Sequence, residues 1–265
     1  MVTEKIASPQ RRSTKKESNN NLMIDIHCHI LPGIDDGAQT EAAALKMLKC
    51  AAADGIDILF CTPHFSNDAA EKMDQIRKKL QEKADALGIK LLPGMEYQYS
   101  HLTMAKNNLH SLAESTYLLI DLGTPTLPPL IAEAFFDLER LGYQIIVAHP
   151  ERYLRDIESC AELFRLGVFF QLNADSILGK NGSGCYKMAK QMIKKGYCHY
   201  IASDAHNSQR TFRLTECREF LTKRYKKEFT ELVMDDNPRR LLSQLPPQNP
   251  PVKSQGWFSK IFNRD

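Results

Sequence analysis

Residues 23–37 read MIDIHCHILPGIDDG, an apolar segment that carries two histidines and runs into an acidic turn. Side chains alternate between the two faces of a strand, so Asp25, His27 and His29 share one face and Cys28 lies on the other. Two adjacent imidazoles suggest a metal site, although surface strands also alternate polar and apolar residues. The other strand-like segments of the chain distinguish these two interpretations.

The chain has 265 residues of ordinary globular composition, which is enough for one large α/β domain without disulfide bonds. A formal net charge of +3, with no basic stripe outside the termini, argues against a nucleic-acid partner. Seven cysteines without a CxxC pair indicate reduced thiols, and no segment approaches the roughly 18 apolar residues of a membrane span. We therefore expect a soluble, cytoplasmic protein.

Three regions of the chain differ in composition. Residues 1–21 are polar and basic, and they predict a disordered leader because they lack the apolar core of a signal peptide. Residues 22–245 have the pattern of one folded domain. Residues 246–265 combine a proline-rich linker with WFSKIFNRD, in which Trp257 lies near Lys260. This tail is expected either to dock at a membrane surface or partner, or to fold onto the domain or remain mobile.

Short apolar segments alternate with helical patterns between the two tails. The predicted strands are 22–30, 56–64, 89–97, 117–122, 143–150, 167–173 and 198–206. Repeated βα units with nearly continuous apolar strands are typical of a parallel sheet that is covered by helices. Seven such units predict an α/β fold of the barrel type.

Polar residues gather at or near the C-terminal end of each predicted strand. They are His27, His29, His64, Glu96, Asp121, His149, Asn173, Asp204 and His206, and Asp36 follows in the acidic turn. The carboxyl ends of parallel strands lie on one side of a sheet, where α/β proteins form their active sites. Each residue alone could have a structural role, but the same arrangement at seven strand ends predicts one shared site.

Five histidines and four carboxylates exceed the ligand set of one tetrahedral zinc ion, and such mixed ligands suit Zn²⁺, Mn²⁺ or Fe²⁺. Three divalent ions with four carboxylates and a bridging hydroxide leave a net charge of about +1, which favours an anionic substrate. Arg152, together with Arg210 or Arg213 or both, follows a site histidine closely, and guanidinium groups match phosphate oxygens in geometry. The pattern predicts metal-assisted hydrolysis of a phosphoester.

The motifs HCH, DDG, TPH, GMEY, YLLIDL, AHPERY and SDAH occur in this order within residues 23–206. This set resembles the polymerase and histidinol phosphatase (PHP) family, and within it the bacterial manganese-dependent tyrosine-protein phosphatases of capsule and exopolysaccharide loci. The resemblance implies a distorted (β/α)7 barrel with three metal ions at the C-terminal strand ends. It also implies a cytoplasmic phosphatase that acts on an autophosphorylated tyrosine kinase of polysaccharide export.

The resemblance further implies a role for each site residue. One ion, with Mn²⁺ expected ahead of Fe or Zn, would bind His27, His29, Glu96 and Asp204; a second would share Glu96 with His149 and Asp121; the third would bind Asp36, His64 and His206. Arg152 matches the phosphate-binding arginine of the family. Arg210 matches a second such arginine after a small gap, which leaves Arg213 as the alternative.

Three acidic residues differ from the other site residues, because one is an unusual ligand and two are expected to lie outside the ligand set. Asp121 stands where relatives commonly carry a glutamate, so its side chain must reach about one methylene further. Asp35, the first residue of the DD pair, is expected to orient the turn. Asp25 is expected to be an outer partner of one of the site histidines.

The sequence also bears on four alternative functions. A cysteine-based phosphatase needs an arginine six residues after its nucleophile, and none of the seven cysteines has one. Histidinol phosphate is the alternative substrate, and a nuclease or polymerase-associated role is disfavoured by the near-neutral charge. A binding module that had lost its metals would have broken ligand positions, whereas every histidine position is filled. His101, His110 and His199 have no companions at strand ends and are expected to be ordinary surface or packing residues.

Overall fold

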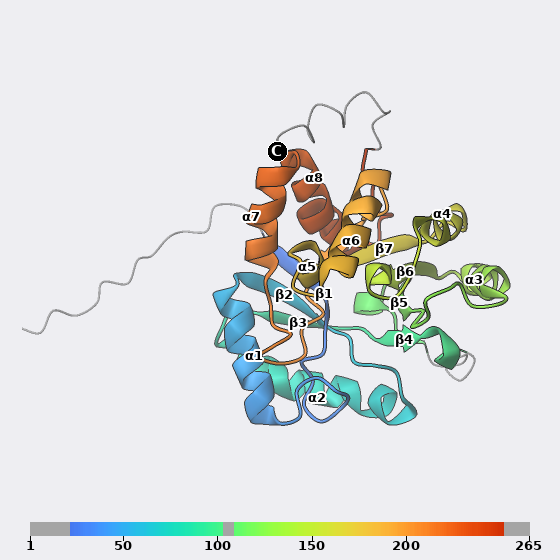
Figure 1. The fold of residues 1–265 in the computed structure, drawn as a ribbon. Coiled ribbons are helices and arrows are strands. Elements are labelled where there is room, and N and C mark those ends of the chain that lie inside the picture. Colours follow the sequence, from blue (N-terminus) through green and yellow to red (C-terminus); the bar gives the residue numbers. More distant parts are fainter. Residues whose placement is uncertain (1–21, 103–108, 252–265) are drawn as a thin grey trace, which may run out of the picture.

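The structure, a computed structural model, describes residues 22–102 and 109–251 and consists of parallel strands with helices around them (Figure 1). The strands are β1 (Met23–Cys28), β2 (Ile56–Cys61), β3 (Lys90–Pro93), β4 (Glu96–Gln98), β5 (Tyr117–Asp121), β6 (Gln144–Ala148), β7 (Phe169–Asn173) and β8 (Tyr200–Ala202). The α-helices are α1 (Glu41–Ala53), α2 (Asn67–Asp85), α3 (Ile131–Arg140), α4 (Ile157–Arg165), α5 (Ala174–Ile177), α6 (Ser183–Lys195), α7 (Leu214–Arg224), α8 (Lys227–Glu231) and α9 (Asn237–Leu242). Short 3-10 helices are η1 (Tyr99–His101), η2 (Leu112–Glu114) and η3 (Pro150–Arg152), and η4 (Leu232–Asp236) is a π-helical turn. The predicted leader and the WFSKIFNRD segment lie outside the described residues.

The strands form two sheets. One has the order β1-β2-β3 and the other the order β4-β5-β6-β7-β8, and all pairs are parallel. Isolated parallel bridges join Cys28 to Ala205 and His64 to Glu96, so the two sheets meet where the end of β1 approaches the residues after β8 and where the residues after β2 approach the start of β4. The prediction of a parallel α/β fold is therefore confirmed, and the strand ends that carry polar residues lie together.

The predicted strand 89–97 is divided into β3 and β4, so the prediction of a single strand there was wrong. Pro93 ends β3, since proline has no N–H group to donate to a neighbouring strand. A Cβ atom at Gly94 would lie 2.8 Å from the Leu112 side chain and 3.0 Å from the Thr62 side chain, so a larger residue here would require these side chains to shift. The displaced strand β4 begins at Glu96 and pairs with β5 instead of β2.

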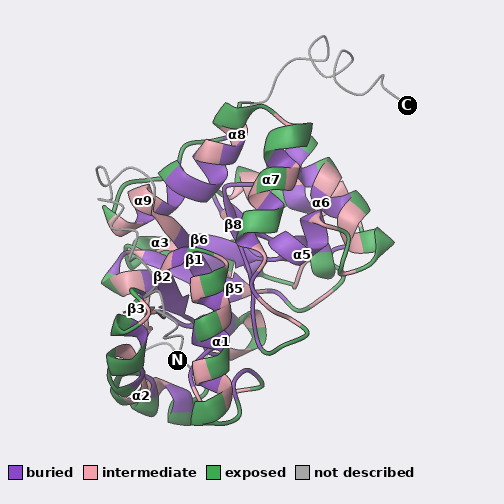
Figure 2. Cartoon of the chain, turned by 90° about the vertical axis from the view of Figure 1, so that its left-hand side faces the viewer, coloured by how far each residue is buried: buried purple, intermediate pink, exposed green. Residues whose placement is uncertain are grey.

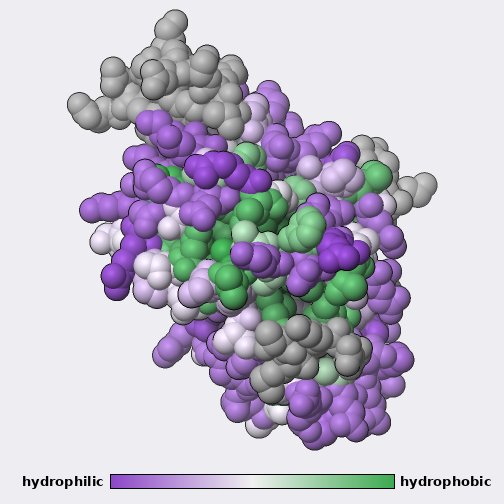
Figure 3. Space-filling view, turned by 90° about the vertical axis from the view of Figure 1, so that its right-hand side faces the viewer, coloured by the Kyte–Doolittle hydropathy of each residue, from purple (hydrophilic) through white to green (hydrophobic). Residues whose placement is uncertain are grey.

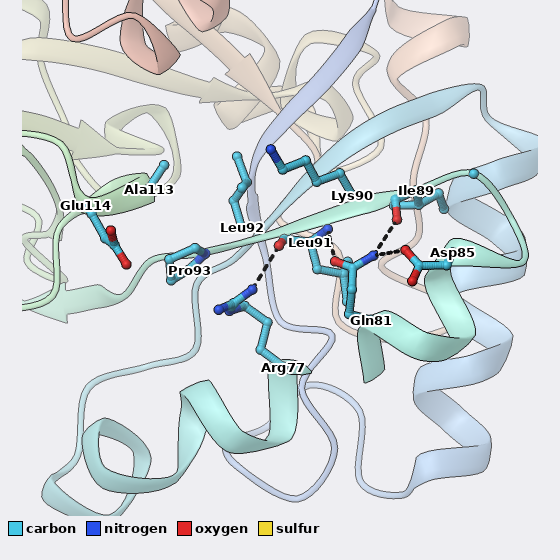
Figure 4. A pocket seen from close by; sticks show the side chains of 11 residues that line it. Arg77, Gln81, Asp85, Ile89, Lys90, Leu91, Leu92, Pro93, Ala113 and Glu114 are labelled. Atoms are coloured by element: carbon cyan, nitrogen blue, oxygen red, sulfur yellow. Dashed lines mark hydrogen bonds between the residues drawn. The ribbon is translucent and has the colours of Figure 1, made fainter. Parts of the chain in front are cut away.

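Side chains of α2 cover the outer edge of β3 (Figure 4). Arg77 donates to the Leu91 carbonyl at 3.1 Å, while Gln81 accepts from the Leu91 N–H at 2.7 Å and donates to the Ile89 carbonyl at 2.9 Å. These bonds satisfy backbone groups that an edge strand would otherwise expose. A hollow of about 650 Å³ beside this edge is lined by none of the predicted site residues, so it is not the candidate site.

The larger helices each have one buried side and one exposed side (Figure 2). In α1 the buried residues are Ala44, Met47, Leu48 and Ala51, which recur at helical spacing. The side chains of Thr40 and Ser66 accept backbone N–H groups at the starts of α1 and α2, as N-caps do. In the described part of the chain, no helix combines the length and the apolar character that crossing a membrane requires.

Apolar residues gather on the face shown in Figure 3, which is the right-hand side of Figure 1. The large apolar side chains that are exposed in the described residues are Leu130, Phe136, Leu141 and Leu245. The first three lie in α3 or directly beside it. Among the described residues, the large exposed apolar side chains therefore lie mainly around this helix.

Candidate metal centre

The polar residues at the strand ends converge on one buried cluster. Three groups of side chains could each hold a metal ion, because their ligand atoms lie within 4.8 Å of one another. They are His29, Asp36, His64 and His206; His27, His29 and Asp204; and His27, Glu96 and His149. The cluster thus joins all the predicted ligands except Asp121.

Glu96 lies at the centre of this cluster and is fully buried. Its Oε1 atom lies 3.0 Å from His149 Nε2, and its Oε2 atom lies 2.9 Å from His64 Nδ1. The same Oε2 atom lies 3.4 Å and 3.3 Å from the Nε2 atoms of His27 and His29. One carboxylate therefore contacts four imidazoles that come from three separate segments of the chain.

Two hydrogen bonds fix the ring orientations of the histidines on β1. The Nδ1 atom of His27 donates to Gln171 Oε1 at 2.9 Å, and the Nδ1 atom of His29 donates to Asp35 at 2.7 Å. In the neutral rings both Nε2 atoms then carry lone pairs, and these two atoms face each other at 3.1 Å. Two facing acceptors require a cation at or near both of them, either a proton or a metal ion.

The acidic turn packs directly against the first strand. A Cβ atom at Gly37 would lie 2.0 Å from the His29 carbonyl oxygen, so only glycine fits there. The Asp35 carboxylate accepts the N–H groups of Gly37 and His64 at 2.9 Å each, in addition to the His29 ring. Asp35 thereby ties the turn to two of the histidines.

Asp36 has a different position from its neighbour in the turn. Its Oδ1 atom lies 3.3 Å from the Nε2 atoms of both His64 and His206, and its side chain is 60% exposed. Burial and the charge of His29 lower the pKa of His206 to about 3, which leaves a neutral imidazole suited to metal binding. This third group therefore lies at the mouth of the cluster.

The electrostatics of the cluster favour bound positive charge. Burial alone would lower the pKa values of His29 and His149, but hydrogen bonds to acidic neighbours, including Glu96, raise them to about 10 and about 9. Burial alone would raise the pKa of Glu96, yet the charge of His27 and the hydrogen bond from His149 hold it well below its usual value. The carboxylates thus retain protons on neighbouring rings, and metal cations compete for the same positions.

Three donors meet on one oxygen of Asp204. Arg152, Arg210 and Asn173 donate to Oδ2 at 2.6, 2.7 and 2.7 Å. The side chains of Arg152 and Arg210 are still 33% and 36% exposed, so both guanidinium groups can reach a phosphate at the mouth of the cluster. Arg213 instead donates two 2.7 Å bonds to Asp175. Of the two alternatives, Arg210 is the one that faces the cluster.

The residues present fit divalent cations. Glu96 Oε2 and Asp204 Oδ1 are buried and face imidazole nitrogens, but they accept no well-aligned hydrogen bond from the described residues, which is costly unless a cation satisfies them. His149 and Asp204 also have left-handed backbones, with φ values of 32° and 53°, as is common at functional sites. Imidazole and carboxylate donors together suit Mn²⁺, Fe²⁺ or Zn²⁺.

Asp121 ends β5 outside the three groups, although the charges of His149 and Glu96 act on it. Burial raises the pKa of Asp121, and its Oδ1 atom accepts the Gly123 N–H at 2.8 Å. Its role as a metal ligand therefore stays a prediction.

Asp25 contacts a site histidine through the backbone of that histidine and not through its ring, because the Asp25 Oδ1 atom accepts the His27 N–H at 3.3 Å. Its carboxylate accepts from the backbone N–H of Ser203 at 3.0 Å and from its hydroxyl at 2.5 Å. Asp25 lies nearer the start of β1 and reaches the end of β8, so the ring of His27 is held by Gln171 instead. Gln171 was missed by sequence reasoning, although it precedes Asn173 by two residues and so shares its strand face.

The model for the capsular polysaccharide synthesis family CpsB/CapC matches residues 23–243. The chain belongs to the CpsB/CapC family. Tyrosine-protein phosphatase YwqE from Bacillus subtilis is 32% identical over 255 residues, which cover 89% of this chain and 99% of YwqE. A putative tyrosine-protein phosphatase CapC from Staphylococcus aureus is 31% identical over 261 residues, which cover 90% of this chain and 100% of CapC.

A solved structure gives the same relationship for this CpsB/CapC chain. It comes from work on YwqE from Bacillus subtilis and CpsB from Streptococcus pneumoniae, described as unique metal-dependent tyrosine phosphatases. The TM-score is 0.74 at 31% identity, with 86% of this chain and 100% of the other covered. Sequence and fold therefore relate this chain to the same group of proteins.

Proposed function

We propose that this chain is a metal-dependent tyrosine-protein phosphatase of capsular or exopolysaccharide synthesis. The observation that carries the proposal is the buried cluster of histidines and carboxylates around Glu96, with Arg152 and Arg210 at its mouth. The names of the relatives in the CpsB/CapC family support the same activity.

Three divalent ions, with Mn²⁺ preferred over Fe or Zn, would be held by nine side chains. These are His27, His29, Glu96 and Asp204 for the first ion, Glu96, His149 and Asp121 for the second, and Asp36, His64 and His206 for the third. When bound, such ions supply positive charge for phosphoryl oxygens and lower the pKa of water. Gln171 and Asp35 hold the rings of His27 and His29 in the orientation that presents Nε2.

Arg152 and Arg210 would bind the phosphate through charge-assisted hydrogen bonds. Both guanidinium groups are held on Asp204, so they are positioned before substrate arrives and little side-chain entropy is lost on binding. Positioning of the phosphate relative to the cluster is the contribution of these two residues to the reaction.

The proposal extends to the architecture and the partner. A distorted (β/α)7 barrel over residues 22–245, between a leader at 1–21 and a tail at 246–265, is supported by the bridges Cys28–Ala205 and His64–Glu96. The substrate would be an autophosphorylated tyrosine kinase of polysaccharide export in the cytoplasm. The family's association with capsule synthesis supports this partner.

Metal analysis and substrate comparison test the proposal. The purified protein should contain more than one transition-metal equivalent, lose turnover of p-nitrophenyl phosphate on chelation, and regain it with Mn²⁺. A metal-free preparation with full activity would contradict the mechanism. Phosphotyrosine peptides should be hydrolysed faster than histidinol phosphate; the opposite preference would favour the alternative of a small-molecule phosphatase.

A further inference from the structure

A groove of about 310 Å³ opens beside the third group of ligands. Asp36 and His206 line it, so one end of the groove is formed by the metal centre itself. A substrate whose phosphate lies at the metal centre could extend its flanking residues along α1 into this groove. The groove is thus continuous with the proposed active site.

One wall of the groove is a single face of α1. Ala43, Lys46, Met47 and Cys50 line it, and their spacing of three, four and seven residues places them on one side of the helix. Ala43 and Cys50 are only half-buried, in contrast to Ala44 and Ala51 on the adjoining face, which are fully buried in the core. This part of α1 therefore offers an apolar surface with one cationic side chain.

A second wall of the groove comes from the loop that carries Arg210. Asn207, Ser208 and Thr211 line the groove on either side of this arginine. The loop is held in shape because Asn207 accepts the Arg210 N–H at 3.1 Å and His206 donates its N–H to the Arg210 carbonyl at 2.8 Å. A phosphate on Arg210 would therefore place the adjoining residues of its peptide along this wall.

The charge of the groove indicates what it accepts. Lys46 is exposed and forms no ion pair with a described residue, although other lysines such as Lys72 and Lys78 pair with acidic neighbours. Asp36, the acidic residue of the lining, would be neutralised by the cations of the proposed centre. The groove then has a net positive charge at Lys46, which complements a carboxylate on the ligand.

We propose that this groove binds the residues flanking the phosphotyrosine and that Lys46 selects acidic flanks. The inference rests on the proposed phosphatase function and names a specificity-determining residue for it. Lys46 acts on the peptide and not on the phosphoryl group, so its effect should be absent with a substrate that has no flanking residues.

Charge reversal tests the groove. Wild type, Lys46→Glu and Lys49→Glu are compared on two phosphotyrosine peptides that differ only in flanking Asp or Lys residues, with p-nitrophenyl phosphate as the substrate without flanks. Lys49 is a matched control because it is exposed on the same helix but does not line the groove. The same peptides with a non-hydrolysable phosphonate provide binding constants by fluorescence anisotropy.

Wild type and Lys49→Glu should prefer the acidic peptide about fivefold in kcat/KM and in binding, as expected for one partly exposed ion pair, and Lys46→Glu should reverse the preference. High salt should weaken the preference. All three proteins should turn over p-nitrophenyl phosphate equally. If Lys46→Glu and Lys49→Glu showed the same preference and still hydrolysed p-nitrophenyl phosphate, the inference about the groove would be wrong and the proposed phosphatase function would stand. Wild type inactive on every substrate with metal supplied would overturn the proposed function and this inference with it.

Discussion

Two buried histidines, His149 and His199, lie in opposite surroundings. His149 follows the C-terminal end of β6, and its Nε2 atom lies 3.0 Å from Glu96. His199 precedes β8 and lies among the rings of Phe164, Phe169 and Phe170. Burial lowers the pKa of His199 to about 4, whereas hydrogen bonding to Glu96 overcomes burial and raises the pKa of His149 to about 9. Neighbouring carboxylates, and not burial, therefore distinguish a histidine of the site from one of the core.

The largest expected effect comes from removing the site histidine. His149→Ala should lower kcat by on the order of a thousandfold or more, because the lost metal ligand removes several kcal/mol of charge stabilisation. Circular dichroism should show that the fold is retained, since the ring lies at a strand end. Steady-state kinetics would contradict the assignment if this variant had wild-type rates, while His199→Asn should remain active.

The core histidine should instead control stability at low pH. Its folded pKa of about 4 lies below the unfolded value of 6.5, so between these values the unfolded chain binds more protons and stability falls as pH falls. The loss should approach about 3 kcal/mol by pH 4. Urea unfolding of wild type and His199→Asn at pH 7 and pH 4.5 isolates the contribution of His199 to the free energy of unfolding, since the asparagine amide does not titrate. Equal losses in both proteins would contradict it.

Arg210 and Arg213, the two candidates for the second phosphate-binding arginine, also differ in their surroundings: Arg210 contacts Asp204 of the cluster and Arg213 contacts Asp175 outside it. Arg152→Ala and Arg210→Ala should each lower kcat/KM by about 10–100-fold, because a hydrogen bond to a charged group contributes roughly 1.5–3 kcal/mol. Arg213→Ala should have a smaller effect, since its guanidinium is paired with Asp175 away from the cluster. Kinetics with a phosphotyrosine peptide would refute this distinction if Arg210→Ala and Arg213→Ala were equally impaired.

The smallest expected effect concerns the support of His27. Gln171→Ala should weaken metal affinity about tenfold, because loss of an outer partner frees the ring to reorient. Calorimetric metal titration measures the change. Gln171→Glu keeps an acceptor for the Nδ1 hydrogen and should restore much of the affinity. Equal affinities in wild type and Gln171→Ala would show that the bond does not support the metal site.

Much of the fold and of the candidate site was predictable because the signals are local. Strand alternation puts His27 and His29 on one face, and the position of His149 and Asp204 just after strand ends follows from the βα pattern. The division of 89–97 was not predictable in this way, since it depends on β3 pairing with β2 while β4 pairs with β5. The Pro-Gly pair marked a break, but its consequence for pairing required the neighbouring element.

The sequence by itself determined the parallel α/β fold and brought the polar strand ends to one side, because periodicity and element order are properties of the chain. Only the tertiary structure decided which side chains contact one another there. In the structure His27 binds Gln171 and Asp25 binds Ser203. Arg210 forms an ion pair with Asp204, and Arg213 forms one with Asp175. These choices depend on distances of a few ångströms between segments far apart in the chain, which local patterns do not encode.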